Sequence, residues 1–485
     1  MHDKDYQVII IGAGFSGLCM AIKLQQAGLS DFLILEGASE VGGTWRENTY
    51  PGAECDIPSA LYSYSFEHNS AWEFKWSEQQ QIFDYQKNIA RKYGLYEKVA
   101  FDQRVESAVF DEDKSVWSIT SVKGDTFRCQ HVVSAVGQLH LPAQPEFAGE
   151  KQYTGAKFHS ANWDHSVELA GKRVAVIGNA ASALQFIPQI APLVEHLTVF
   201  QRSANWVIAK QDRSYASIEQ WVSEKVPLIT RLYRLSLWLR GEWLVLPAMR
   251  RNRIAQRILK WMAQKSLRQF IQDPELIKKL TPDYPVGAKR ILFSDDYYGA
   301  LVRNNVHLDT SGVKHFTRQG ILRNDGVEES FDVVIYGTGF KTNPFLASID
   351  VQGLSGRSLR EHWHGGAHAY LGITTYDFPN FYMMYGPNTN LGHNSIIIMI
   401  EAQARYIVKC IERLKISGQQ TLQVKEAVES QYNEEIQARL KKMSFADVKE
   451  SWYMDGGRIT NNWAGSTLEY RRRLRKVKWN NYLIT

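Results

Sequence analysis

Two stretches of the chain combine a continuous apolar run with a glycine-containing turn. The first begins with the run Val8–Ile11 and continues as GAGFSGLCMAIKLQQAG, and the second, residues 173–185, reads RVAVIGNAASALQ. Continuous apolar runs of this length are typical of parallel strands that are buried on both faces. Each run is followed by a turn and a helical stretch, so we predict two strand–turn–helix units built on parallel sheets.

The first turn has the spacing of a dinucleotide-binding loop. Gly12, Gly14 and Gly17 form GxGxxG, and the next predicted strand, FLILE, ends at Glu36. The first glycine allows the tight turn, the second lets a pyrophosphate approach the backbone, and the third lets the helix pack on the strand. The helix N-terminus favours the phosphates, and Glu36 can accept the ribose hydroxyls. The alternative is an ordinary glycine-rich turn in a βαβ unit.

The segment after Glu36 favours a flavin as this dinucleotide. Residues 42–56, GGTWRENTYPGAECD, offer a close-approach loop at two glycines, the hydroxyl of Thr44 and the flat face of Trp45. A bound flavin needs a long covering segment after the acidic residue, whereas a dehydrogenase that uses only a nicotinamide does not.

The second turn has a weaker glycine pattern but a more informative strand after it. Gly178 is present, while Ala180 and Ala183 stand where glycines are usual, and the strand LTVFQRS ends in Arg202. An alanine Cβ crowds the approach of a phosphate. An arginine at the strand end accommodates a 2′-phosphate, which indicates NADPH rather than NADH. A surface arginine is the alternative.

A polar segment separates the two units. Residues 153–164, YTGAKFHSANWD, have neither the alternation of a strand nor the apolar stripe of a helix. We therefore expect a linker that joins the two nucleotide domains and couples their relative movement, with Gly155, His159 and Trp163 at fixed offsets. We expect Trp163 to pack between the domains and His159 to have a structural role, with general acid as the alternative.

Residues 211–285 mix apolar residues and arginines at helical spacing, and we interpret them as a helical insertion that lines the substrate entrance. Within it, residues 229–261 carry Trp238, Trp243 and Trp261 among several arginines. An interfacial membrane helix has this composition, and so does a buried insertion helix whose arginines extend to solvent. We favour the buried helix.

Composition excludes several classes of protein. The net charge of +6 is mild for 485 residues, and no block of Lys and Arg is long enough to indicate nucleic acid. The four cysteines form no CxxC pair and no zinc-finger spacing, so we expect reduced thiols, no metal centre and a cytoplasmic protein. The absence of CxxC argues against a disulfide reductase. We expect neither a signal peptide nor a spanning helix.

Several of these segments together resemble the class B flavin-dependent monooxygenases, and most closely the type I Baeyer–Villiger monooxygenases. The linker matches that family's FxGxxxHxxxW followed by Pro or Asp, with Asp164 at the end and Tyr153 in place of the usual Phe. Four more segments are similar to the family, and with the linker and the turns they span residues 6 to about 475: YPVGAKRILFSDDYY (284–298), FDVVIYGTGF (331–340), FPNFYMMYGPNTNLGHNS (378–395) and NNWAGSTLEYRRRLR (461–475).

The resemblance implies roles for individual residues. Arg290 would be the active-site cation and Asp56 would pair with it, while Arg202 and Lys289 would hold the 2′-phosphate. The alternatives are a solvated charge for Arg290, a turn-capping role for Asp56 and a surface position for Lys289. The predicted FAD-binding residues are Gly12, Gly14, Phe15, Gly17, Glu36, Thr44, Trp45, Asp56, Tyr62 and Val105. The predicted NADP-binding residues are Gly178, Asn179, Ser182, Ala183, Gln185, Arg202, Ser203, Lys289, Arg290 and Trp463.

The resemblance also implies the reaction. It is the conversion of a hydrophobic ketone to an ester or lactone through a flavin C4a-peroxide, with FAD and NADPH as cofactors and O2 as co-substrate. One alternative is an oxygenase acting on nitrogen or sulfur, and the other is a non-catalytic flavoprotein that binds FAD and NADPH. Association with a membrane surface is a further alternative, and we expect no nucleic-acid partner.

The predicted fold is α/β, with two Rossmann-like dinucleotide-binding domains and a helical insertion. Residues 1–145 and 341–485 would form the FAD domain, 150–210 and 286–340 the NADPH domain, and 211–285 the insertion.

Overall fold

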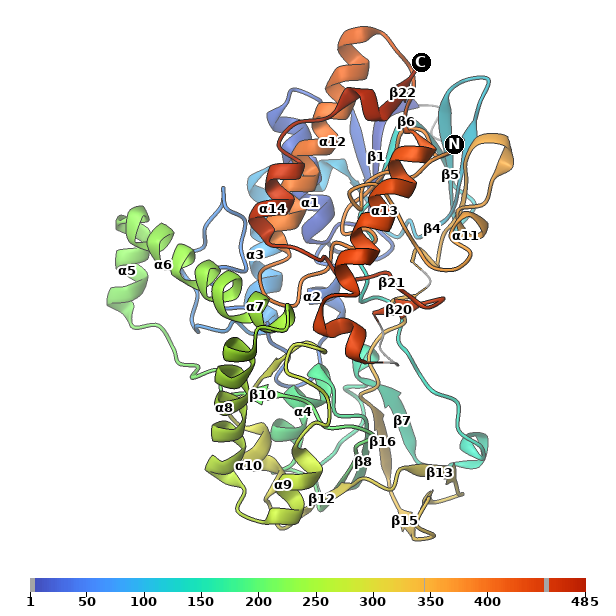
Figure 1. Cartoon of the computed structure of the whole chain (residues 1–485). Helices are drawn as coiled ribbons and strands as arrows, with labels where there is room; N and C mark the ends of the chain where they lie inside the picture. The colour runs from blue at the N-terminus through green and yellow to red at the C-terminus, as the bar shows by residue number, and fades with distance from the viewer. Residues whose placement is uncertain (1–4, 344, 449–452) are drawn as a thin grey trace.

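Two β-sheets organise the chain, one above the other in the view of Figure 1. The computed structural model describes residues 5–343, 345–448 and 453–485. The first sheet has eight strands, seven of them in the order β17-β4-β5-β6-β1-β2-β3, with β18 paired to β6. The second has five parallel strands in the order β12-β9-β8-β16-β7. The predicted α/β class with two nucleotide-binding folds is confirmed.

The strands of the first sheet are β1 (Asp5–Ile11), β2 (Phe32–Leu35), β3 (Val99–Ala100), β4 (Val105–Asp111), β5 (Val116–Ser121), β6 (Thr126–Ser134), β17 (Asp350–Gln352) and β18 (Phe381–Met383). Those of the second are β7 (Ala156–His159), β8 (Arg173–Ile177), β9 (His196–Phe200), β12 (Val306–Asp309) and β16 (Val333–Tyr336). The main helices around the sheets are α1 (Phe15–Gln26), α3 (Gln79–Lys92), α4 (Ala181–Ile190), α10 (Tyr297–Leu301), α12 (Ile397–Ser417), α13 (Glu426–Leu440) and α14 (Thr467–Arg473).

Strand β1 is apolar from Val8 to Ile11 because both faces of that part of the strand are covered. Val8 and Ile10 lie in one core with residues of α1 and α12. Ile9 and Ile11 face a different core, formed with β5 and β18. Side chains alternate across a strand, so a strand buried on both faces needs an unbroken apolar sequence.

The segment predicted to be a linker without a strand contains one. Residues Ala156–His159 form β7, whose residues pair in parallel with Val333–Tyr336 of β16. The strand lies at the edge of the second sheet and has only four residues. A strand of four residues spans only two periods of alternation, which is too short a pattern to stand out in a polar segment, so the sequence analysis missed it.

Trp163 packs inside the core of the second sheet rather than directly between the sheets. Its ring lies 5.1 Å from that of Phe158 and 5.3 Å from that of Phe186 on α4. The ring of Tyr50, from the predicted flavin-covering segment, also contacts Phe186 at 6.1 Å. His159 accepts a hydrogen bond from the backbone N–H of Ala161 through Nδ1, which fixes the turn after β7. Trp163 is therefore linked to the covering segment through Phe186.

The two glycine-containing turns have nearly the same backbone. Gly12 has φ 102° and Gly178 has φ 103°, a region that favours glycine. At the next position but one, Gly14 has φ −82° and ψ −166°, and Ala180 has φ −78° and ψ −170°. Alanine adopts that extended conformation without strain, so Ala180 leaves the shape of the turn unchanged.

The second alanine is accommodated by a glycine on a neighbouring strand end. A Cβ on Gly17 would collide with the carbonyl oxygen of Gly12, so the first turn requires glycine there. In the second turn Ala183 is buried beside Gly337, just after β16. A Cβ on Gly337 would lie 2.9 Å from the Cβ of Ala183. Ala183, which stands where the motif usually has glycine, thus packs against Gly337, where the absence of a side chain leaves room for the alanine methyl group.

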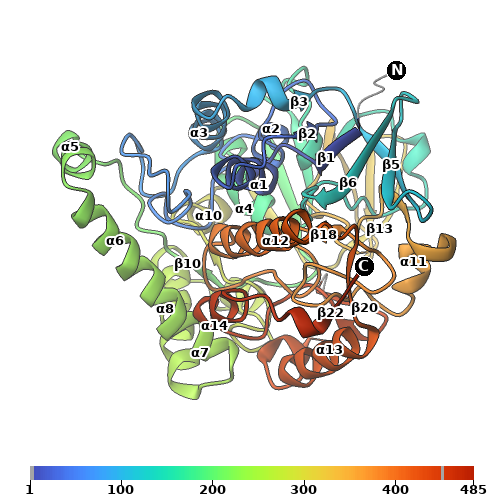
Figure 2. The same ribbon diagram turned by 90° about the horizontal axis from the view of Figure 1, so that it is seen from above.

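The helical insertion forms one edge of the molecule when seen from above (Figure 2). It consists of α5 (Ser217–Lys225), α6 (Pro227–Arg240), a π-helical turn (Gly241–Val245), α7 (Leu246–Met249), α8 (Arg253–Phe270) and α9 (Pro274–Leu280). The favoured interpretation of residues 229–261 as a buried helix is wrong for part of this segment, because Trp243 and Trp261 are 74% and 61% exposed. No helix among the described residues is both long and apolar enough to cross a membrane.

A buried carboxylate holds α13 to a loop of the first sheet. Glu429 accepts hydrogen bonds from the hydroxyl of Thr375 at 2.9 Å and the backbone N–H of Tyr376 at 2.6 Å, and it pairs with His368 at 2.7 Å. Burial acts to raise the pKa of Glu429, but hydrogen bonds from His362 and His368 outweigh it and leave the pKa below its usual value. These three side chains come from segments 67 residues apart, so spacing in the sequence could not indicate the cluster.

We predict that Gly337→Ala destabilises the protein by about 1–3 kcal/mol, because the added methyl group overpacks the contact with Ala183. Urea unfolding measures the change. Ala183→Gly alone should cost about 0.5–1 kcal/mol through helix propensity. Adding Ala183→Gly to Gly337→Ala should recover part of the loss, and a double variant less stable than both single variants would contradict the assignment.

Candidate active site

A large cavity of about 1540 Å³ extends between the two sheets. It is lined by the residues after β1 and β2 on one side, by those after β8 and β9 on the other, and by α6, the π-helical turn and α8 of the insertion. The carboxyl ends of parallel strands are where nucleotides bind in open α/β sheets. The cavity exceeds the volume of roughly 300–1,000 Å³ usual for one small ligand, so it has room for two dinucleotides.

Most of the predicted FAD residues line the end of this cavity at the first sheet. They are Gly12, Gly14, Phe15, Glu36, Thr44, Trp45, Asp56, Tyr62 and Val105. The carboxylate of Glu36 accepts hydrogen bonds from the backbone N–H groups of Ala13 at 2.8 Å and Ala38 at 3.0 Å. It also pairs with Arg46 at 3.0 Å. These contacts fix the carboxylate at the end of β2, on the wall of the cavity.

Both helices that begin at the cavity, α1 and α4, have N-termini suited to an anion. In the described chain, the N-cap side chain bonds the first turn of neither helix, and neither first turn holds an acidic residue, although the N–H of Phe15 in α1 donates to the side chain of Gln86 at 3.1 Å. A Cβ placed on Gly14 would meet only Gly43, at 3.7 Å, so nothing but another glycine approaches this backbone. A helix N-terminus with a bare approach favours phosphate groups. The residues therefore fit a pyrophosphate at each helix.

The predicted NADP residues that line the opposite end include two neighbouring cations. The full set there is Gly178, Asn179, Ser182, Gln185, Arg202, Ser203, Lys289 and Arg290. The pKa of the Lys289 ammonium is lowered by burial and further by the positive charge of Arg202, while Asp283 opposes the shift. Two cations that repel one another across a cavity wall favour an anion between them. This arrangement fits the 2′-phosphate of NADPH.

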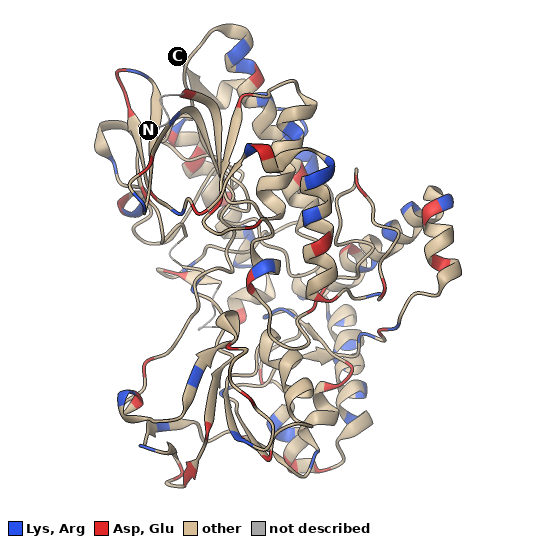
Figure 3. Cartoon of the chain, turned by 180° about the vertical axis from the view of Figure 1, so that it is seen from behind, with Lys and Arg blue, Asp and Glu red and all other residues tan. Residues whose placement is uncertain are grey.

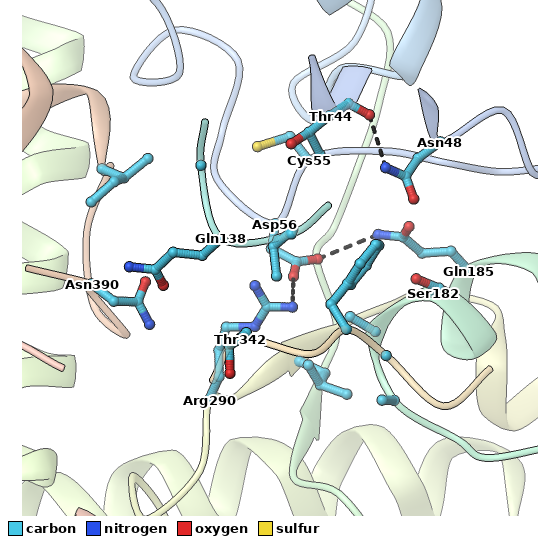
Figure 4. A pocket seen from close by; sticks show the side chains of 18 of the residues that line it. Thr44, Asn48, Cys55, Asp56, Gln138, Ser182, Gln185, Arg290, Thr342 and Asn390 are labelled. Atoms are coloured by element: carbon cyan, nitrogen blue, oxygen red, sulfur yellow. Dashed lines mark hydrogen bonds and ion pairs between the residues drawn. The ribbon is translucent and has the colours of Figure 1, made fainter. Parts of the chain in front are cut away.

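The centre of the cavity holds an ion pair, shown in Figure 4. The guanidinium of Arg290 donates to Asp56 with 3.0 Å between Nη2 and Oδ2. The amide of Gln185, on α4, donates to the other carboxylate oxygen at 3.4 Å. The side chain of Arg290 is 38% exposed because it faces the interior of the cavity. The covering segment, the returning segment and α4 therefore meet at one carboxylate.

Burial disfavours the charged form of both members of this pair, so it shifts their pKa values in opposite directions. Burial raises the pKa of Asp56, and the positive charge of Arg290 lowers it by less, so the pKa stays above its ordinary value. Burial alone would lower the pKa of Arg290, but the negative charge of Asp56 and the nearby hydroxyls of Tyr453 and Tyr385 raise it overall. The guanidinium is thus a permanent cation.

Further residues around Arg290 were missed by the sequence analysis. The backbone N–H of Arg290 donates to the hydroxyl of Tyr453 at 3.0 Å. The hydroxyl of Tyr385 donates to Asn390 at 2.6 Å, and the amide of Gln138 donates to the carbonyl of Tyr385 at 2.9 Å. All of them line the cavity. The segment GPNTN, which contains Asn390, was assigned to the flavin side, but nothing in its spacing marked these individual side chains.

Another missed group is a buried lysine on the cavity wall. Lys210 is 5% exposed and pairs with Glu54. Burial lowers the pKa of Lys210 to about 8, although Asp212, Asp295 and Asp296 act to raise it. A lysine with such a pKa is only partly charged near neutral pH. Its position at the end of a short strand gave no signal in the sequence.

Six predicted site residues lie outside the cavity lining. Gly17 and Ala183 pack helices against strands, as described above. Trp463 was predicted to contact NADP, but it is 2% exposed in the core of the first sheet, between the guanidinium groups of Arg439 and Arg473. Gly155, His159 and Trp163 belong to β7 and the turn after it and are likewise not among the described residues that line the cavity.

Comparison with known proteins connects this geometry to a family. Residues 9–236 match the family described as pyridine nucleotide-disulphide oxidoreductase. A Baeyer-Villiger monooxygenase from Pseudomonas aeruginosa is 40% identical over 482 residues, which cover 99% of this chain and 91% of that protein.

Two solved structures are similar over nearly their whole length. A cyclohexanone monooxygenase from Rhodococcus sp. Phi1 bound to NADP+ has a TM-score of 0.89 and 25% identity, with 99% of both chains covered. OTEMO in complex with FAD and NADP has a TM-score of 0.87 and 27% identity, also with 99% of both chains covered.

We predict that Lys289→Gln raises the KM for NADPH by about tenfold and leaves the KM for NADH nearly unchanged. The difference is expected because only NADPH carries the 2′-phosphate. One charge-assisted contact is worth about 1.5–3 kcal/mol before solvent screening, which reduces the effect to about tenfold. Steady-state rates of oxidation of each nucleotide measure the ratio. Lys172→Gln, an exposed lysine before β8, is the control and should alter neither value. An equal loss for both nucleotides would place Lys289 elsewhere than at the 2′-phosphate.

Proposed function

We propose, from the premise that this chain belongs to the Baeyer–Villiger monooxygenases and is an NADPH-dependent flavin monooxygenase, that it converts a hydrophobic ketone to an ester or lactone. The observation that carries the proposal is the ion pair between Asp56 and Arg290 at the centre of the cavity, with 3.0 Å between Nη2 and Oδ2. FAD held at the first turn and reduced by NADPH would activate O2, which supplies the inserted oxygen atom. The residues of this chain bind, orient and stabilise the reacting groups.

Arg290 is suited to negative charge that develops on a carbonyl oxygen. Its guanidinium lies at the cavity wall and stays charged at every working pH, because Asp56 and two tyrosine hydroxyls more than offset the effect of burial on its pKa. A preorganised cation in a cavity with little water stabilises such charge strongly. A lysine there would serve less well, because burial can discharge an ammonium group.

Asp56 and Gln185 act as positioning residues. Asp56 holds the guanidinium through Oδ2, while Gln185 holds Asp56 through Oδ1 and also accepts a hydrogen bond from the hydroxyl of Tyr50 at 2.8 Å. Since Gln185 lies on the helix that begins at the predicted NADP end, the orientation of Arg290 is linked to that helix.

The insertion gives one side of the cavity an apolar lining. Leu237, Leu244 and Val245 line it from α6 and the π-helical turn, and Leu259 and Met262 line it from α8. An apolar wall favours a hydrophobic substrate and limits the entry of water. This lining supports a ketone with a substantial hydrocarbon part.

The activity test is the incubation of the purified protein with NADPH, O2 and a panel of cyclic, linear and steroidal ketones, with products identified by gas chromatography and mass spectrometry. Esters or lactones are the expected products. Products formed only from sulfides and amines in a parallel panel would assign the chain to heteroatom oxygenation instead. Oxidation of NADPH with no organic product from either panel would contradict both functions.

We predict that Arg290→Ala lowers kcat for ester or lactone formation by about 10²–10³-fold, the usual cost of removing one group that stabilises an oxyanion. Arg290→Lys should lie between the wild type and the alanine variant. Arg303→Ala, an exposed arginine near β12, is the matched control and should retain full activity. A normal rate of product formation in the alanine variant would remove Arg290 from the mechanism.

We predict that the acid limb of the kcat profile reports the protonation of Asp56. Because burial raises the pKa of Asp56, the carboxyl takes up its proton above the ordinary value of 3.8, and the ion pair is lost as the pH falls through that raised value. Asp56→Asn should lower the plateau and flatten the acid limb. Measurement of kcat across the acid range tests this, and an unchanged acid limb in the variant would assign it to another group.

A further inference from the structure

Exposed large apolar side chains are concentrated on the helical insertion. Of the 20 such side chains in the described part of the chain, 11 lie between Ile218 and Trp261. That segment has 44 of the 485 residues. Single exposed apolar residues are normal on any surface, but a concentration of this kind marks a site of interaction.

The exposed apolar residues follow one face of each of the two longer helices. On α6 they are Leu228, Ile229, Leu232 and Leu235, and on α8 they are Ile254, Ile258 and Trp261. Spacing of three and four residues places each set on one side of its helix. Figure 2 shows α5, α6 and α8 in succession along one edge of the molecule. We call these exposed residues, with Ile218, Trp221, Val226 and Trp243, the outer face of the insertion.

The same segment carries an excess of positive charge. Residues 217–261 contain nine Lys and Arg against three Glu, a net charge of +6, which equals the formal net charge of the entire chain. Figure 3 shows Lys and Arg recurring along these helices. Arg253, Arg257 and Lys260 follow the apolar row of α8 at the adjoining positions and are exposed. No described carboxylate lies within 4.0 Å of their charged nitrogen atoms.

We propose that the outer face of the insertion docks on the surface of an anionic lipid bilayer. Apolar and tryptophan side chains beside a row of cations are the features of a helix that lies in a membrane interface, where the apolar groups enter the acyl boundary and the cations meet anionic headgroups. The long side chains of Arg and Lys can extend from the apolar row to the headgroups. Docking would be peripheral, since no described helix can span a membrane.

Charge distinguishes a bilayer from a second copy of this chain. A symmetric dimer through this face would bring the exposed cations Arg253, Arg257 and Lys260 of two copies together, whereas anionic lipid complements them. The opposite sides of the same helices line the cavity with Leu237, Leu259 and Met262. The docked helices would therefore form the wall between the cavity and the lipid.

Flotation of the purified holoenzyme on a density gradient tests this, with vesicles of phosphatidylglycerol and phosphatidylcholine compared with vesicles of phosphatidylcholine alone. We expect flotation with the anionic vesicles, weakened by high salt. Arg253→Gln, Arg257→Gln and Lys260→Gln together should weaken binding on the order of a hundredfold, at roughly fivefold per cation. Trp243→Gln with Trp261→Gln should also reduce flotation and diminish the blue shift of tryptophan fluorescence on vesicle binding.

Two control variants carry matched changes outside the insertion. Val122→Gln with Ile416→Gln removes two other exposed apolar residues, and Lys151→Gln with Lys172→Gln removes two other exposed cations. Both should float like the wild type. The proposal is overturned if the holoenzyme does not float with anionic vesicles, or if the insertion variants float as well as the controls. A dimer in sedimentation velocity that Trp243→Gln with Trp261→Gln dissociates, without flotation, would assign the face to a second copy. Since flotation needs no turnover, these results are independent of the substrate proposed above.

Discussion

The contact between Asp56 and Arg290 is the constraint on which the arrangement of this site depends. It joins the segment that follows the first nucleotide turn to the segment that returns from the helical insertion, and Gln185 adds the helix of the second turn. Removing one partner would leave the other charge without its counterion at the cavity wall, a cost that falls mainly on Asp56 because its side chain is the less exposed of the two. The pair therefore links three segments of the chain at one carboxylate.

The helical insertion serves the cavity and the surface with different sides of the same helices. Its inner residues, such as Leu237 and Leu259, are buried at the cavity, while outer residues such as Leu232 and Ile258 remain exposed. An ordinary amphipathic helix buries its apolar stripe and exposes polar residues. Helices α6 and α8 have apolar residues on both sides, so packing within this chain explains the apolar residues on the inner side but not those on the outer side.

The second nucleotide turn shows how a fold tolerates the loss of a motif residue. Ala180 replaces a glycine at a position whose backbone is extended, where alanine is unstrained. Ala183 replaces one where space is short, and Gly337 on the adjacent strand end leaves the room that a Cβ there would take. The glycine pattern of the second turn is incomplete in the sequence, but the turn keeps its shape in the structure. Extended backbone accommodates Ala180, and Gly337, more than 150 positions along the chain, accommodates Ala183.

Local patterns in the sequence were sufficient for the features that depend on neighbouring residues. The apolar runs, the turns at Gly12 and Gly178 and the helical insertion follow from periodicity and backbone freedom, and the family resemblance assigned Asp56 and Arg290 to one site. The sequence failed where long-range contacts decide. Strand β7 exists because β16 pairs with it, Trp463 is buried because α13 and α14 cover it, and Tyr453 reaches Arg290 only through the tertiary fold. Which side of an amphipathic helix is covered also depends on what packs against it. Composition therefore revealed the arginines and tryptophans of the insertion, and only the tertiary structure decided that they remain exposed.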